Sequence, residues 1–231
     1  MQGKHRFSHK EEDFFKDLAK EKDFFMSKAK RRPLSKGSII FFENDSSEFC
    51  YYLEHGIIRI FKISPTGKEP IYFIRKQGDI FGIAELINSH PRKSNAQTLT
   101  ECTIWELNKT DFETMIERYP NFSKNIINTL GNRIRYLGDQ VESLMVCDVV
   151  TRMAKLIVYL AYENISFENE WEQPVTIKKS LTQEQMASMT GSCQQTVSEI
   201  LKGFQEEGLI EANRGNITVL NPLKLIRKAE H

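Results

Sequence analysis

Apolar and polar positions change their spacing twice along the chain. Between residues 33 and 107, β-branched and aromatic residues form short runs that glycines separate. Short strands with regularly spaced turn residues are typical of an antiparallel barrel or sandwich. Ser64-Pro65-Thr66-Gly67 predicts a hairpin turn, because proline presets one backbone dihedral and glycine accepts a positive φ. The runs expected to be strands are 38–42, 50–53, 57–63, 70–74 and 102–107.

Helical spacing precedes and follows this region. Residues 10–30, where aromatic positions alternate with Lys, Glu and Asp, predict an amphipathic helix. After the strands we expect a short helix over 109–119 and a long one that opens at Pro120, since a first turn tolerates the missing N–H. Another amphipathic helix is expected over 152–162, and a polar, acidic connection over 163–174.

Apolar residues of the long helix repeat at alternating intervals of four and three. They are Leu130, Ile134, Leu137, Val141 and Leu144. This heptad spacing is typical of a coiled-coil seam and predicts a homodimer. The alternative is that the same face packs on the β domain as ordinary core.

The pattern over residues 182–205 predicts a helix-turn-helix. Thr182 can cap the first helix, because its hydroxyl accepts a free backbone N–H. Ala187 is small enough for a second helix to cross closely, and Gly191 provides the turn. The apolar residues that would lock the pair are Met186, Val197, Ile200 and Leu201.

Two short strands follow directly, within residues 208–219 and around Asn213-Arg214-Gly215. Helix, turn, helix and hairpin in this order is the layout of a winged helix. The C-terminal region is therefore expected to bind DNA.

Composition changes this picture little. The chain has 231 residues, 40% hydrophobic and 27% charged, which is typical of a globular domain protein. No apolar run approaches the roughly 18–20 residues that cross a bilayer, and residues 1–30 are charged throughout. We therefore expect a cytoplasmic protein with no membrane partner.

Charge is not concentrated in the region expected to bind DNA. Residues 1–147 carry 23 Lys+Arg and 20 Asp+Glu, a net charge of +3, whereas residues 148–231 carry 9 and 11, a net charge of −2. DNA binding must therefore come from locally placed cations. No Ser/His/Asp, Cys/His or paired-carboxylate spacing stands out, so an enzyme is not expected.

Four cysteines are too widely spaced to form a local metal site, and no metal is expected. They are Cys50, Cys102, Cys147 and Cys193, and we expect them to be small buried side chains. Cys193 starts the second helix of the pair, where the helix dipole can lower a thiol pKa. A redox role for Cys193 is the alternative that this leaves open.

The chain, from about residue 33 to residue 223, resembles the cyclic-AMP receptor/fumarate-nitrate regulator (Crp/Fnr) family of bacterial transcription factors. The residues that carry the resemblance are Gly37, 51–56, Gly67-Lys68-Glu69, Gln77-Gly78-Asp79, Phe81-Gly82, Pro91-Arg92, Asp148, Arg152 and 191–210. It implies an α+β fold with an N-terminal antiparallel, jelly-roll-like β-roll, a long central dimerisation helix and a C-terminal winged helix-turn-helix. The implied domains are 1–119 (N-terminal helix and cyclic-nucleotide-binding-like effector domain), 120–147 (dimerisation helix) and 148–231 (DNA-binding domain).

The chain departs from relatives that bind cyclic AMP. They place a glutamate after the glycine equivalent to Gly82, where this chain has Ile83 and reaches an acid only at Glu85. Their purine-facing hydroxyl pair becomes Leu137-Gly138, whose side chains cannot form hydrogen bonds. The effector is therefore expected to be a small molecule other than cyclic AMP. The expected pocket residues are Gly82, Ile83, Ala84, Glu85, Arg92, Lys93, Ser94, Arg133 and Leu137. Three of these, the cations Arg92, Lys93 and Arg133, could form an anion pocket; the alternative is that they are solvated surface charges.

The second helix also departs from the family. Relatives usually carry an Arg-Glu-Thr-Val-x-Arg type sequence that reads G·C pairs, whereas this chain has 194–199 as Gln-Gln-Thr-Val-Ser-Glu. Glutamine can pair with adenine and glutamate can accept from cytosine N4, so we expect an atypical half-site, richer in A·T. The residues expected at DNA are Thr182, Lys179, Ser192, Gln194, Gln195, Ser198, Glu199, Lys202 and Arg214. The alternative for the two glutamines is a solvated helix surface.

The expected function is therefore a homodimeric, sequence-specific transcription regulator whose β-roll senses an effector and repositions the recognition helices. Its expected partners are double-stranded DNA with a palindromic site, a second copy of the chain and RNA polymerase. The alternative is a ligand-binding β-roll module that has lost specific DNA binding, which the acidic C-terminal region and Glu199 favour.

Overall fold

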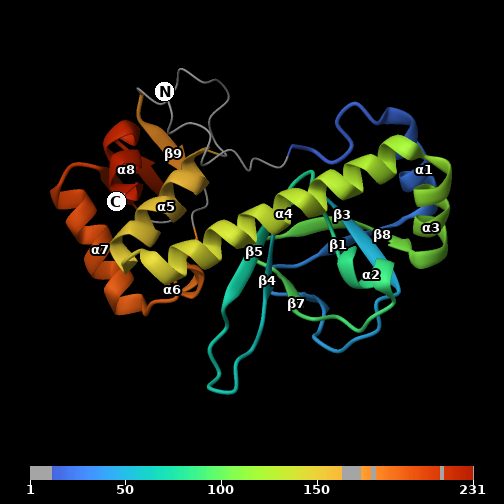
Figure 1. Cartoon of the computed structure of the whole chain (residues 1–231), viewed down its shortest axis with the longest axis horizontal. Coiled ribbons are helices and arrows are strands. Elements are labelled where there is room, and N and C mark those ends of the chain that lie inside the picture. Colours follow the sequence, from blue (N-terminus) through green and yellow to red (C-terminus); the bar gives the residue numbers. More distant parts are fainter. Residues whose placement is uncertain (1–11, 163–172, 178–180, 214–215, 231) are drawn as a thin grey trace. The chain divides into compact units, whose positions relative to one another are not determined.

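The computed structural model describes residues 12–162, 173–177, 181–213 and 216–230. They form two compact units that divide inside one long helix, α4 (Pro120–Val146), between Arg135 and Tyr136 (Figure 1). No helix in the described part of the chain combines the length and the apolar character needed to cross a membrane.

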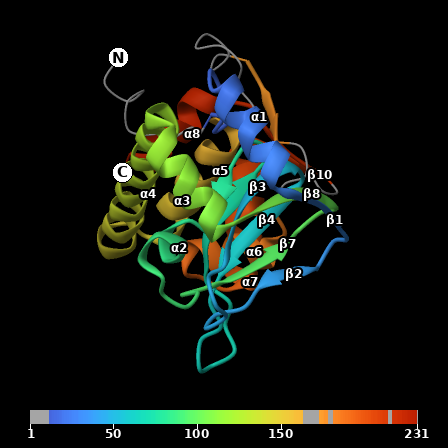
Figure 2. The same ribbon diagram turned by 90° about the vertical axis from the view of Figure 1, so that its right-hand side faces the viewer.

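The N-terminal unit is built on two four-stranded sheets in which every pair is antiparallel (Figure 2). One sheet has the order β1 (Lys30–Leu34), β8 (Cys102–Asn108), β3 (Phe49–His55), β6 (Ile80–Phe81). The other has the order β2 (Ile39–Phe41), β7 (Asn95–Thr98), β4 (Ile57–Phe61), β5 (Ile71–Lys76). A core that includes Leu53, Ile58, Phe81 and Ile104 draws residues from both sheets. This confirms the antiparallel β-roll.

The expected hairpin turn joins β4 to β5. The Ser64 N–H donates to the Lys68 carbonyl at 2.8 Å, and the Gly67 N–H donates to the Ser64 carbonyl at 2.9 Å. Gly67 has φ +77°, a conformation that favours glycine, so the residue types at this turn account for its geometry.

The expectation of one helix over 10–30 was wrong. The helix α1 spans only Ala19–Lys28. Ahead of it, the Phe14 N–H donates to the Gly78 carbonyl at 2.8 Å, and the Phe15 N–H donates to Asp13 Oδ1 at 2.8 Å. Both phenylalanines are buried in the core of the N-terminal unit. One tertiary hydrogen bond, one local bond to the Asp13 side chain and aromatic burial therefore hold this segment out of the helix that its spacing predicted.

Helices cover the second face of the sheet that contains β3 and β8. Its core includes Tyr52 of β3 and Leu107 of β8, together with Phe25 of α1, Phe112 of α3 (Lys109–Arg118) and Phe122 of α4. A short helix, α2 (Ala84–Asn88), follows β6. The expected short helix over 109–119 and the long helix that opens at Pro120 are thus confirmed.

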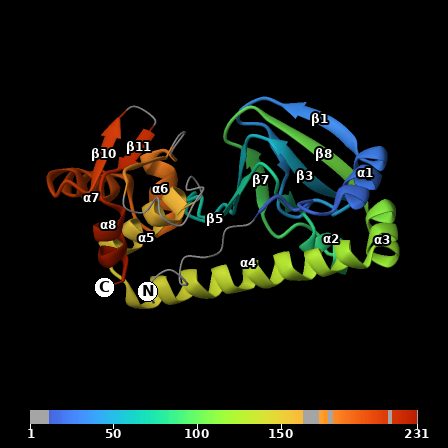
Figure 3. The ribbon, with the colours of Figure 1, turned by 90° about the horizontal axis from the view of Figure 1, so that it is seen from above.

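The C-terminal unit is centred on α5 (Val149–Tyr162), eight of whose residues are buried (Figure 3). Around it lie α6 (Gln183–Thr190), α7 (Gln194–Glu206), α8 (Pro222–Ala229) and a sheet of order β10 (Ile210–Asn213), β11 (Asn216–Val219), β9 (Val175–Ile177). The helix-turn-helix and the following hairpin are confirmed. The structure adds β9 and α8, which the sequence reading had not assigned.

Candidate DNA-binding surface and effector domain

A capping box fixes the start of α6. Thr182 Oγ1 accepts from the Gln185 N–H at 3.2 Å, and Gln185 Oε1 accepts from the Thr182 N–H at 2.9 Å. Two N–H groups that lack helical partners are satisfied in this way. The position of Thr182 as N-cap is confirmed; its hydroxyl oxygen serves there as an acceptor, and the O–H can still donate outward.

Gly191 ends α6 in the left-handed conformation, with φ +61°. Its N–H donates to the Ala187 carbonyl, as does the N–H of Ser192 at 3.0 Å. A side chain at Gly191 would adopt this conformation only with strain. The glycine therefore sets the turn that aims α7.

The two faces of α7 differ sharply. Val197, Ile200, Leu201 and Phe204 are buried. Gln194, Gln195, Ser198, Glu199 and Lys202 are exposed. Because buried side chains hold the helix on one side, the polar residues stand together on the other. The structure thus brings five of the residues expected at DNA onto one surface.

Two interactions link exposed side chains along that surface. Gln195 Nε2 donates to Glu199 Oε1 at 3.1 Å, and Lys202 Nζ lies 3.7 Å from Glu206 Oε1. Lys202 is the single cation in the sequence of α7, which carries two glutamates. The helix therefore offers hydrogen-bonding groups and little positive charge.

The wing follows α7 directly. β10 and β11 pair from Ile210↔Val219 to Asn213↔Asn216, and β11 pairs in turn with β9. Two expected DNA contacts, Lys179 and Arg214, lie outside the described residues.

The cysteines do not share one environment, so the expectation of four buried thiols was wrong. Cys50 and Cys102 are buried, Cys147 is half-buried and Cys193 is exposed at the N-cap of α7. A hydrogen bond with the Thr196 hydroxyl, at 3.2 Å, holds the pKa of the Cys193 thiol below its usual value. Cys193 stands at the start of α7 because the turn after Gly191 ends there; its exposed side chain is not part of the core.

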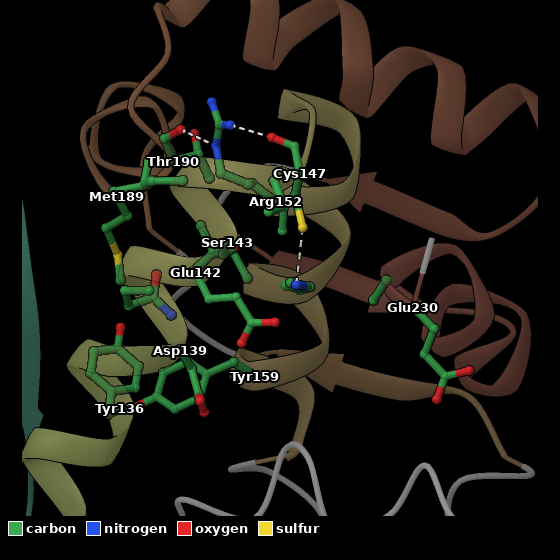
Figure 4. A pocket seen from close by; sticks show the side chains of 16 residues that line it. Tyr136, Asp139, Glu142, Ser143, Cys147, Arg152, Tyr159, Met189, Thr190 and Glu230 are labelled. Carbon is green, nitrogen blue, oxygen red and sulfur yellow. Dashed lines mark hydrogen bonds between the residues drawn. The ribbon is translucent and has the colours of Figure 1, made fainter.

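A two-residue joint connects α4 to α5, and Arg152 spans it. Arg152 Nη1 donates to the Cys147 carbonyl at 2.6 Å, and its Nε donates to the Thr190 carbonyl, at the end of α6, at 2.8 Å (Figure 4). Asp148 caps α5 by accepting from the Thr151 N–H at 2.7 Å. The Arg152 side chain therefore links the joint between α4 and α5 to the end of α6, the helix that precedes α7. Sequence reading had placed Arg152 in the family pattern without assigning it this contact.

The heptad positions of α4 remain largely uncovered. Ile134 is 70% exposed, Val141 56%, Leu144 54% and Leu137 40%. Leu130 differs, because it is half-buried against the core that includes Phe122 and Ile126. At this first position the structure favours the alternative of packing on the β domain. Ile127, one heptad before Ile134, is 68% exposed and extends the uncovered stripe.

Arg92 is almost fully buried, with 1% of its surface exposed. Its Nη1 donates to the Gly82 carbonyl at 2.8 Å and its Nη2 to the Phe49 carbonyl. The guanidinium lies 4.4 Å from the centre of the Phe41 ring, and Glu85 Oε2 is 3.9 Å from Nη1. Arg92 Nε has no hydrogen-bond partner among the described residues. The alternative of a solvated surface charge is therefore wrong for Arg92.

The other expected pocket residues do not form one cluster. Arg133 is also largely buried, and its Nη2 donates to the Ile80 carbonyl at 2.6 Å. Ile83 is 1% exposed and belongs to the helix-covered core. Ala84 and Lys93 are exposed, and Ser94 is half-buried. The structure thus brings together Gly82, Glu85 and Arg92. Lys93 is exposed, which agrees with the alternative of a solvated surface charge.

Sequence reasoning missed the aromatic residues beside Arg92. The Phe41 and Tyr51 rings are stacked at 5.9 Å between centres, and the Tyr51 and Phe81 rings at 5.0 Å. These side chains fill the space between the sheets next to the arginine. Their aromatic character in strand-like runs was the available signal, but it did not distinguish a pocket wall from core.

Comparison with known proteins places these features in a family. Residues 31–119 match the cyclic nucleotide-binding domain, and residues 151–228 match the Crp-like helix-turn-helix domain. A "CRP-like cAMP-activated global transcriptional regulator" from Mycobacterium tuberculosis is 26% identical over 194 residues, which cover 84% of this chain and 85% of that protein. The "cAMP-activated global transcriptional regulator CRP" of Pasteurella multocida is 27% identical over 183 residues, with 79% and 86% covered.

A solved structure shares the fold. A mutant of CooA from Carboxydothermus hydrogenoformans aligns with a TM-score of 0.75 at 23% identity, covering 88% of this chain and 89% of that one. The chain belongs to the Crp/Fnr family of bacterial transcription regulators, which are not enzymes. It carries the family's cyclic-nucleotide-binding domain and its helix-turn-helix DNA-binding domain.

Proposed function

We propose that this regulator binds a palindromic DNA site as a homodimer, and that its β-roll senses a small effector other than cyclic AMP. The observation that supports this proposal most directly is the division of α7 into a buried apolar face and an exposed face with Gln194, Gln195 and Ser198. Such a helix can enter a major groove while its other side stays packed in the domain. Effector binding would reposition the two recognition helices, and RNA polymerase is a further proposed partner.

Base contacts would carry more of the specificity than charge. The Gln195 amide and the Glu199 carboxylate suit the exocyclic amino groups of adenine and cytosine. Lys202, with Lys179 and Arg214 from outside the described residues, would contact phosphates, and Thr182 and Ser192 would do so at the helix starts. Few cations predict a modest affinity, best measured at low salt.

The uncovered stripe on α4 supports the homodimer. Ile127, Ile134 and Val141 are seven residues apart, as are Leu137 and Leu144, and all five are exposed in the single chain. A heptad stripe on a 27-residue helix is best buried by an identical helix. Pairing would place two recognition helices about 34 Å apart, one turn of DNA.

The residues around Gly82 do not suit cyclic AMP. The position that holds a glutamate in relatives is Ile83, which is buried in core and offers no acceptor. Arg92 donates from both terminal nitrogens to backbone carbonyls, so those two bonds fix the guanidinium in place and leave fewer of its N–H groups for an anion. Leu137 and Gly138 have no side-chain group for a purine.

One observation favours the second candidate, a ligand-binding module without specific DNA binding. Glu199 places a negative charge on the exposed face of α7, and Glu206 partly neutralises the positive charge of Lys202. Both would oppose approach to phosphates.

Selection of bound duplexes from a random-sequence pool tests the proposal. We expect a palindrome whose half-sites, richer in A·T than those of relatives, lie about one helical turn apart. Absence of any enriched sequence would favour the second candidate. Calorimetry with cyclic AMP is expected to give no micromolar binding, and a tight isotherm would overturn the effector argument.

A further inference from the structure

A cavity of about 330 Å³ lies within the C-terminal unit (Figure 4). Residues from the last turns of α4, from α5, from the end of α6 and from α8 line it. Among them are two groups with reactive side chains, the Cys147 thiol and the Lys155 amine. Both residues are half-buried, so a small solute can reach them through this cavity.

The two groups are in direct contact. Lys155 Nζ donates a hydrogen bond to Cys147 Sγ at 3.2 Å. Among the described residues, the sulfur is the one polar partner of that amine. A thiol sulfur is a weak hydrogen-bond acceptor. The Lys155 nitrogen therefore lies beside Sγ, held only by a weak hydrogen bond.

Backbone contacts hold the sulfur-bearing residue in place. Cys147 lies in the joint between Val146, the last residue of α4, and Val149, the first of α5. Its N–H donates to the Ser143 carbonyl at 3.0 Å, and its carbonyl accepts from Arg152. Lys155 is on the second turn of α5, so its flexible side chain is the part that moves to close the remaining distance.

We propose that Cys147 and Lys155 form an oxidative modification site, at which oxidation of the thiol by hydrogen peroxide leads to a bond between Sγ and Nζ, a sulfenamide. In the first step the sulfur attacks one peroxide oxygen, the O–O bond breaks, and a sulfenic acid and water form. Sulfur loses two electrons and the peroxide gains them. Sulfenic acids condense with nearby thiol or nitrogen nucleophiles.

The second step is that condensation. The Lys155 ammonium first gives one proton to solvent; the lone pair of the resulting amine attacks Sγ, the S–O bond breaks, and the departing hydroxide takes a second proton from the nitrogen and leaves as water. No further electrons are transferred. Thiol, amine and one peroxide thus give one S–N bond and two waters. The bond removes the cationic group and closes a ring over the joint between α4 and α5.

Peptide mass spectrometry of the whole protein tests this. The protein carries Cys193→Ser, which removes the exposed thiol, and is treated with peroxide and digested with trypsin. We expect the peptides on either side of Arg152 to appear joined, with cleavage blocked at Lys155 and a mass about 2 Da below that of the separate thiol and amine. Dithiothreitol should restore the two free peptides.

Two variants provide the controls. Lys155→Arg keeps the charge but lacks the amine, so Cys147 should remain a sulfenic acid that dimedone traps. Cys147→Ser with Cys193 intact tests a thiol whose partner is the Thr196 hydroxyl, and it should give the dimedone adduct and no joined peptide. The proposal is overturned if Cys147 resists peroxide, or gives only dimedone adduct or sulfinic acid beside Lys155. Linkage to another lysine would overturn it equally.

Discussion

Gln195 and Glu199 are joined across one turn of α7 by a hydrogen bond of 3.1 Å, from Nε2 of the amide to Oε1 of the carboxylate. The bond uses one of the two amide hydrogens, so the amide oxygen, the second amide hydrogen and the other carboxylate oxygen are not engaged by it. Acceptors match the exocyclic amino groups of adenine and cytosine in the major groove. This relationship makes Gln195 the most informative residue of the recognition surface.

Replacing Gln195 with alanine should weaken specific DNA binding and leave the dimer intact. A bidentate side-chain contact to one base discriminates by about 1–3 kcal/mol, which corresponds to roughly tenfold to a hundredfold in affinity. Fluorescence anisotropy with the selected DNA site measures the loss, and ultracentrifugation measures the dimer. Gln205→Ala, an exposed glutamine at the other end of the same helix, is the matched control and should bind normally. Equal loss in both variants would mean that the recognition surface is misassigned.

An aspartate at Val141 should dissociate the dimer. The side chain is 56% exposed in the single chain and lies at a heptad position, so pairing would bury an unpaired charge. We expect the dimer dissociation constant in analytical ultracentrifugation to rise at least about tenfold, or 1.4 kcal/mol. Val146→Asp is the control, since Val146 is 72% exposed and lies off the stripe. A dimer that tolerates Val141→Asp as well as Val146→Asp would contradict the assigned seam.

Arg92 should matter for the stability of the β-roll. Arg92→Met would leave the Gly82 and Phe49 carbonyls without their donor in a buried place. Hydrogen bonds from charged groups contribute about 1.5–3 kcal/mol each, so a loss of about 3 kcal/mol is expected. Thermal unfolding measures it, with Lys93→Met, the exposed neighbour, as control. Unchanged stability would show that the guanidinium is free to serve a ligand.

Asp148 should contribute stability that depends on pH. The Thr151 N–H, which donates to Oδ1 at 2.7 Å, holds the pKa of Asp148 below its ordinary value of 3.8. A carboxyl whose pKa falls on folding stabilises the folded state fully above the unfolded-state pKa, and this contribution is lost as pH falls through the folded-state pKa. We expect Asp148→Ala to cost about 1 kcal/mol at neutral pH.

The gap between Asp148→Ala and the unsubstituted protein should narrow below about pH 4, as the carboxyl takes up its proton. Thermal unfolding at neutral pH and at acid pH measures both values. Asp148→Asn keeps an acceptor at the cap and should show only a small loss. An equal gap at both pH values would contradict the role of the carboxylate charge.

Local sequence signals predicted the elements whose geometry is set locally. The capping residues Thr182 and Gln185, the turn at Gly191 and the hairpin at Gly67 all lie where residue type alone decides the backbone. Pro120 likewise opens α4 as expected. These features position the recognition surface, which is why that surface could be outlined from the sequence.

Elements that depend on distant partners were not predicted. The edge strand β1 begins Lys-Arg-Arg and has no apolar alternation; Arg32 pairs with Glu106 of the adjacent strand β8, and Arg31 pairs with Glu54 of β3, one strand further on. The start of α1 was misplaced because Phe14 enters a core that only the fold creates. The burial of Arg92 and its hydrogen bonds to the Gly82 and Phe49 carbonyls could not be predicted for the same reason, because both depend on tertiary packing. The Asn221 cap before Pro222 was a usable signal for α8 that the sequence reading passed over.

Binding to the protein's own upstream DNA tests the central claim most directly. In a gel-shift at low salt, we expect the protein to retard that DNA as a dimer, and the double variant Gln194→Ala and Gln195→Ala to lose the shift while it remains dimeric. Competitor DNA of scrambled sequence should not abolish the wild-type shift. No retardation in any ligand condition, or equal retardation by the double variant, would contradict a sequence-reading role for α7.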